Sequence, residues 1–73
     1  MKAKLISSEK SGKVEYYNCT ISVDGKELKM RVTLEDGVVQ DYRSATGESD
    51  KWNQLSQDEK EAIRKEIRSY YNY

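Results

Sequence analysis

Apolar and polar residues alternate along the first half of the chain, which is the pattern of strands that bury one face. The first run begins at Met1 and alternates Ala3 and Leu5 with two lysines. The longest run extends from residue 27 to 34, and its apolar members are Leu28, Met30, Val32 and Leu34. We therefore predict one strand at the start of the chain and a second, more regular one near its centre.

A further strand is predicted between these two runs. One of its faces is apolar and consists of Tyr17, Cys19, Ile21 and Val23. Val14 and Tyr16 have the opposite parity, so either the first part of the strand faces the other side or a bulge near Tyr16 resets the alternation. Residues 9–13 are polar and include Gly12, and we expect them to form the preceding turn.

Two Asp-Gly pairs, Asp24-Gly25 and Asp36-Gly37, punctuate the alternating pattern. A two-residue Asp-Gly loop supplies the positive φ angles that tight hairpins need. The pairs therefore predict a meander of antiparallel strands, ending in a short fourth strand over residues 38 to about 43. Its apolar residues suit two competing faces, and we expect Val38 and Tyr42 to point inward.

The C-terminal third has a helical period instead. Ser56 and Glu59 have the spacing of a capping box, in which each side chain binds the backbone N–H of the other. Apolar residues then recur at helical intervals, namely Ala62, Ile63, Ile67, Tyr70 and Tyr71. The chain is thus predicted to be a single α+β domain, residues 1–73, with the order β-β-β-β-α. It comprises a four-stranded antiparallel meander over about residues 1–43, a loop over 44–55, and one C-terminal helix over about 57–71 packed on one sheet face.

Composition narrows the classes of partner. The 73 residues approach the lower size at which one core is sufficient without disulfides or metals. Thirteen basic and 13 acidic side chains give a net charge of zero, which argues against a partner held by overall electrostatics. The charge is unevenly spread, because acidic residues outnumber basic ones by eight to three between residues 32 and 61.

The sequence lacks the residue that catalysis and metal binding most often use. The chain has no His, the commonest general base and metal ligand, so we expect no enzyme, no cofactor and no metal site. Its single cysteine, Cys19, lies at an inward strand position and is expected to be a buried apolar side chain. We find neither a secretory signal nor an apolar stretch of membrane-spanning length, so the expected location is cytoplasmic.

The sequence best fits a non-catalytic protein-interaction module, an adaptor or inhibitor that occupies the surface of a larger protein partner. By analogy, a bacterial or phage accessory protein would fit. Candidate contacts are an exposed polar sheet face, a Tyr-rich end of the helix beside basic residues, and acids that mimic a negatively charged ligand. The candidate residues are Lys29, Arg31, Arg64, Arg68, Tyr70, Tyr71, Tyr73, Asp36 and Asp41.

Three alternatives stay open. The basic residues, with Lys65, would instead serve a small nucleic-acid-binding module, in which Tyr16 is a stacking ring beside Lys29 and Arg31. Tyr70 and Tyr71 would instead complete the core. A homodimer would form through the edge of the fourth strand or through the helix and enlarge a small core. We expect no membrane partner.

Overall fold

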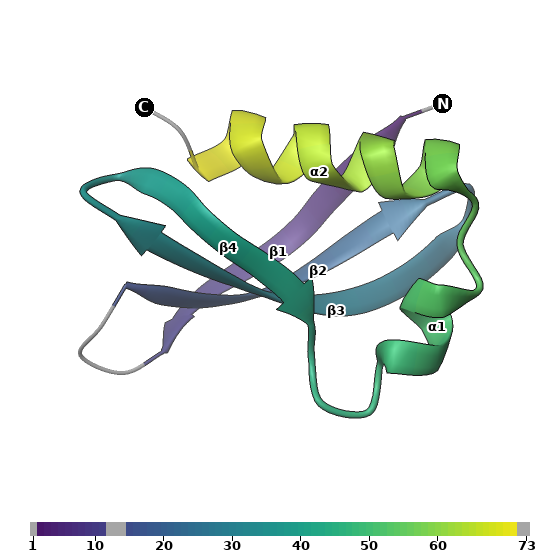
Figure 1. Ribbon diagram of the computed structural model, residues 1–73, viewed down its shortest axis with the longest axis horizontal. Helices are drawn as coiled ribbons and strands as arrows, with labels where there is room; N and C mark the ends of the chain where they lie inside the picture. Colours follow the sequence, from purple (N-terminus) through teal and green to yellow (C-terminus); the bar gives the residue numbers. More distant parts are fainter. Residues whose placement is uncertain (1, 12–14, 72–73) are drawn as a thin grey trace.

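The computed structural model describes residues 2–11 and 15–71. It contains one antiparallel sheet in which the strands lie side by side in chain order, as β1 (Ala3–Ser11), β2 (Tyr16–Val23), β3 (Lys26–Glu35) and β4 (Val38–Ser44). The long helix α2 (Gln57–Tyr71) lies across one face of this sheet, and a short helix, α1 (Ser49–Asn53), lies beside its end (Figure 1). The predicted α+β meander with a C-terminal helix is confirmed.

Both Asp-Gly pairs form the expected hairpin turns. Their φ angles are 51° at Asp24, 73° at Gly25, 53° at Asp36 and 78° at Gly37. Positive φ at both central residues is the signature of a type I′ turn, whose twist matches that of the flanking strands. These turns fix the register of β3 against both of its neighbours.

The core lies between the sheet and α2. Its members, all of them buried, are Leu5, Cys19, Ile21, Val23, Leu28, Met30, Val32, Leu34, Leu55, Ile63, Ile67 and Tyr71. The alternating positions predicted for the second and third strands supply seven of these residues, so the apolar pattern and the buried face agree.

At the start of β2, successive side chains point to opposite faces of the sheet, and β2 contains no bulge there. Pairing with β3 runs unshifted from Tyr16, opposite Thr33, to Val23, opposite Lys26. Tyr16 is 49% exposed on the outer face, while Tyr17 packs against the core. The sequence left two alternatives, a bulge near Tyr16 or a strand whose first part faces the other side. The second is confirmed at Tyr16. The turn predicted over residues 9–13 is wrong for residues 9–11, which extend β1 and pair with the start of β2. Gly12 in the rest of that turn, Val14 and Met1 lie outside the described residues.

The expectation that Val38 and Tyr42 both point inward is wrong for Val38, which is 59% exposed. A shift in register causes the difference: Leu34 pairs with Val39, whereas Thr33 pairs with Asp41. Gln40 is therefore the extra residue of a β-bulge, which reverses the parity of the strand. The bulge lets Val39 and Tyr42, which simple alternation would place on opposite faces, both pack against the core.

A second bulge lies on the other edge strand. Leu5 pairs with Ile21 and Ser7 with Thr20, so Ile6 is the extra residue, and it is 51% exposed. Beyond it, Ser8 lies opposite the buried Cys19. α2 also protects this edge, because the Glu66 carboxylate accepts a 2.7 Å hydrogen bond from the backbone N–H of Leu5.

The region predicted as a loop before α2 contains the helix α1, which is a correction to the prediction. This helix has only five residues, and Trp52 is its partly buried contact with the core. One turn of helix is too short to show a period in the sequence. The Trp52 ring meets Tyr42 edge-on with centroids 6.3 Å apart, so α1 packs against the end of the sheet.

The capping box at the start of α2 is confirmed. The Ser56 hydroxyl accepts from the Glu59 N–H at 3.1 Å, and the Glu59 carboxylate accepts from the Ser56 N–H at 2.8 Å. The same carboxylate forms a 3.0 Å ion pair with Lys26 at the start of β3. These bonds, with the Ser56 N–H foremost, lower the pKa of Glu59 to about 2 although the residue is only 5% exposed.

Candidate functional site

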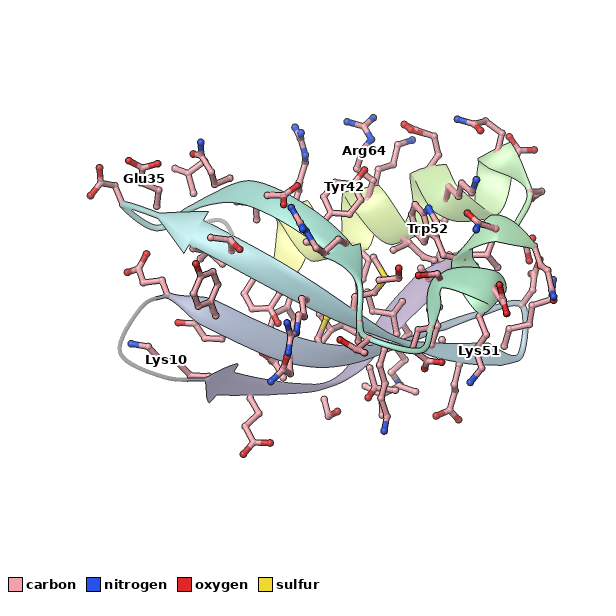
Figure 2. The ribbon with its side chains drawn as sticks, turned by 60° about the horizontal axis from the view of Figure 1, so that its bottom comes forward. Lys10, Glu35, Tyr42, Lys51, Trp52 and Arg64 are labelled. Atoms are coloured by element: carbon pink, nitrogen blue, oxygen red, sulfur yellow. The ribbon has the colours of Figure 1, made fainter. Side chains whose placement is uncertain are left out.

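The face of the sheet opposite α2 is not covered by any other element in the described part of the chain. Figure 2 turns this face toward the viewer. It is hollowed at two places, with volumes of about 570 and about 610 Å³. Asn18 and Arg31, which face each other across β2 and β3, line both hollows. We call the first hollow the arginine hollow; its lining residues are Tyr16, Asn18, Arg31, Thr33, Asp41 and Arg43.

Two arginines face each other in the arginine hollow. Arg31 on β3 is the register partner of Arg43 on β4, and both are exposed. Asp41, two residues before Arg43 on the same strand, accepts from its guanidinium at 3.2 Å (Nε) and 2.9 Å (Nη2). Arg31 forms no ion pair with any other residue that the structure describes. The hollow therefore contains two guanidinium groups and one carboxylate.

Lys29, the next outward residue of β3, borders the second hollow. Its backbone N–H donates to the Glu48 carboxylate at 3.1 Å, and the Lys51 ammonium lies 3.3 Å from the same side chain. The bond from the Lys29 N–H, together with Lys51, lowers the pKa of Glu48 below its usual value. Glu48 thus fastens the loop before α1 to the sheet and keeps a negative charge beside the Lys29 side chain.

The candidate cations on the helix lie on the other side of the sheet. Arg64 is bound to Glu61 one turn earlier, and this pairing lowers the pKa of the Glu61 carboxyl. Arg68 is exposed in the last turn of α2. Figure 2 shows Arg64 beside Tyr42 and near Trp52, on the covered side. The cations proposed from the sequence are therefore divided between two surfaces and do not form one patch.

The tyrosines at the end of α2 have different environments. Tyr70 is 52% exposed, whereas Tyr71 is 3% exposed and completes the core. The Tyr71 hydroxyl shares a 2.5 Å hydrogen bond with the Ser8 hydroxyl, and its ring lies 5.1 Å from that of Tyr17. Burial raises the pKa of Tyr71. Tyr71 is thus part of the scaffold and offers no contact area, and Tyr73 lies outside the described residues.

The candidate acidic residues do not lie together either. Asp36 forms the tip of the β3–β4 turn, and its neighbour Glu35 lies at the opposite end of the molecule from Lys51, the partner of Glu48 (Figure 2). Asp41 lies between these ends and is paired with Arg43. A single surface that mimics an anionic ligand is therefore not formed by these acids.

The single cysteine is part of the core. Cys19 is buried, and burial raises the pKa of its thiol, so this group is held in its neutral form. Within residues 2–11 and 15–71, no three His, Cys, Asp or Glu side chains gather as metal ligands would. Over the same residues, no helix has both the length and the apolar character required to cross a bilayer.

Sequence reasoning placed Arg31 among the candidate contacts but missed Arg43. A regular two-residue hairpin would pair Arg31 with Tyr42, and the Gln40 bulge moves Arg43 into that position instead. The available signal was the spacing of Val39 and Tyr42. If both are required to face inward, the strand must contain an extra residue, and Arg43 then points outward.

Comparisons of this chain with protein-family models, with curated proteins and with solved structures find no match.

Proposed function

We propose that this chain is a non-catalytic protein-interaction module, an adaptor or inhibitor that uses the open sheet face to occupy the surface of a larger protein. The observation that carries the proposal is the state of Arg31. Its guanidinium is exposed on a central strand, lines both hollows, and has no ion-pair partner in the described part of the chain. A partner that supplies an acceptor would gain a charge-assisted hydrogen bond without first breaking one.

The residue types around Arg31 support a protein partner. Arginine and tyrosine are enriched among the residues that dominate binding energies at protein interfaces. Tyr16, half exposed at the rim of the same hollow, offers a large ring with few rotatable bonds. Asn18 and Thr33 add neutral hydrogen-bonding groups to this surface. The sheet presents all four side chains on a backbone that is paired on both sides.

The alternative of nucleic-acid binding has less support on this face. A phosphate backbone is held by several cations together. The open face instead places Asp41 in one hollow and Glu9 in the other, beside Arg31 in both. Tyr16 is the one aromatic ring that lines either hollow in the described part, whereas single strands are held by successive stacking rings.

A bacterial or phage origin is an analogy with small accessory proteins that act by occupying a site. The cytoplasm suits a chain whose single cysteine is buried and has no internal disulfide partner.

The proposal is tested by immobilising the protein and capturing partners from a nuclease-treated lysate. Two double variants are compared, with equal changes of charge and ring area. Tyr16→Ala with Arg31→Gln alters the open face, and Tyr70→Ala with Arg68→Gln alters the exposed end of α2. We expect the open-face variant to lose about tenfold or more of the capture of one specific protein, and the helix variant to keep it.

Circular dichroism of both variants verifies that the fold is retained. Equal capture by the open-face variant and the wild type would contradict the proposal. Capture that occurs from an untreated lysate but not from the nuclease-treated one would support the nucleic-acid alternative instead.

A further inference from the structure

The arginine hollow has an arrangement of charge that the folded chain leaves incomplete. Arg31 and Arg43 are direct cross-strand partners, a position in which like charges repel. One carboxylate, that of Asp41, reaches Arg43 through two nitrogens, and its side chain is half exposed. Because Arg31 has no ion-pair partner among the described residues, a second carboxylate would relieve the repulsion and satisfy the free guanidinium.

The groups around Arg31 suit a carboxylate in particular. A guanidinium binds a carboxylate through two parallel N–H···O bonds. On one side of Arg31 stands Asn18, its register partner on β2, whose amide can donate a further hydrogen bond. Tyr16 and Thr33, whose side chains carry hydroxyl groups, line the same hollow. Its volume of about 570 Å³ is large enough for one or two side chains of a partner.

We propose that the arginine hollow binds an acidic, Asp- or Glu-containing segment of the protein partner, with Arg31 as the anchor for one carboxylate. Asp41 acts as an internal competitor that occupies Arg43 until a partner carboxylate replaces it. This inference rests on the proposed function and specifies the chemistry of the partner. A nucleic-acid strand is the less favoured occupant, because it presents a series of phosphates and is held by several cations together. The arginine hollow suits a single carboxylate better, because Arg43 is already paired with Asp41 and Arg31 is the one guanidinium there without an ion pair among the described residues.

The roles of Arg31 and Asp41 predict opposite effects of mutation. Removing the Arg31 charge by Arg31→Gln takes away the anchor and weakens binding of an acidic segment by about tenfold or more. Removing the competitor by Asp41→Asn frees Arg43 and strengthens binding by about two- to fivefold, as expected for loss of an exposed ion pair. Both residues are exposed, so neither substitution disturbs the core.

The experiment is a titration of the ¹⁵N-labelled protein, followed by NMR, with a capped peptide of alternating Glu and Gly. The same peptide with Gln for Glu is the uncharged control, and single-stranded DNA of equal charge is the competing ligand. Two variants match the charge changes away from the hollow: Arg68→Gln on α2 for Arg31→Gln, and Asp36→Asn at the hairpin tip for Asp41→Asn. We expect the Glu peptide to shift the Arg31 and Asn18 side-chain signals, and the Gln peptide to leave them unchanged.

Equal weakening by Arg31→Gln and Arg68→Gln would overturn the inference, because overall charge would then explain the binding. Equal strengthening by Asp36→Asn and Asp41→Asn would overturn the role of Asp41. Tighter binding of the DNA, dependent on Arg31, would replace the acidic segment by nucleic acid. If the Glu peptide shifts no signal while the open-face double variant still loses its captured protein, the proposed function stands and the carboxylate chemistry fails. If capture does not depend on the open face, the proposed function itself fails.

Discussion

The two faces of β3 carry residues with opposite roles, although they alternate along one strand. Met30 is fully buried beneath α2, and its neighbour Arg31 is exposed and unpaired within the described part of the chain. On the covered face, polar groups as well as apolar ones are satisfied: Glu59 makes three hydrogen bonds, with Lys26 and Ser56, and Tyr71 makes one with Ser8. On the open face, the polar groups are held in place by the strands but are not all paired. The covered face therefore accounts for stability, and the open face is available for recognition.

The largest expected difference is between Met30 and Arg31. Met30→Ala leaves a cavity in the core and lowers the free energy of unfolding by about 2–5 kcal/mol. Arg31→Ala changes it by no more than about 0.5 kcal/mol, because the side chain is exposed and makes no ion pair in the described structure. Urea denaturation of the two variants measures both values. Similar losses for both would show that the open face also holds the fold together.

Glu59 on the covered side and Asp41 on the open face are both carboxylates in ion pairs, and their removal should affect stability differently. At pH 7, Glu59→Gln lowers stability through loss of the Lys26 ion pair. Asp41→Asn changes stability by less than about 1 kcal/mol, because its pair with Arg43 is exposed.

The pH dependence of Glu59 has a definite sign. Its folded-state pKa is about 2, below the ordinary value of 4.5, so its stabilisation is present above pH 4.5 and is lost as the pH falls toward 2. Urea unfolding at pH 4.5 and pH 2 should show a smaller acid loss in Glu59→Gln than in the wild type. An equal loss in both would mean that Glu59 does not carry this effect.

Val39 and Val38 test the bulge in β4. Val39→Ala removes methyl groups that pack against the core and costs about 1.5 kcal/mol. Val38→Ala removes the same groups from an exposed site and has almost no effect. Thermal unfolding of both variants is the measurement. The reverse order would place the extra residue somewhere other than Gln40.

The smallest expected difference in the free energy of unfolding is between removal of the Tyr71 hydroxyl and removal of the Tyr16 hydroxyl. Tyr71→Phe breaks the hydrogen bond with Ser8 and costs about 1 kcal/mol. Tyr16→Phe leaves the core untouched, because the ring is half exposed on the open face. Chemical denaturation under identical conditions compares them. A cost for Tyr16→Phe as large as for Tyr71→Phe would indicate a structural role for the outer ring.

The sequence predicts those parts of the fold that local chemistry determines. The Asp-Gly turns and the Ser56–Glu59 capping box each depend on residues within three positions of one another, and the structure contains all of them. Long alternating runs likewise identify the covered faces of β2 and β3.

What sequence reasoning missed depends on contacts between distant residues. The bulge at Gln40 allows both Val39 and Tyr42 to reach the core, and no local signal shows which residue becomes the extra one. For the same reason, the residues of the arginine hollow could not all be predicted from the sequence. Arg31 was recognisable from the alternation of its own strand, but its partner Arg43 depends on the register of the neighbouring strand.

The hydrogen bond from Leu5 to Glu66 has a consequence for self-association. β1 and β4 are the outer strands of the sheet, and continuous fibre growth requires two free edges on every copy. A strand that adds to β1 must first displace the Glu66 carboxylate, whereas pairing of β4 with β4 of a second copy is symmetric and ends with two molecules. The helix that packs on the core thus also hinders strand addition at β1, so pairing between copies is expected to favour β4 and to stop at two molecules.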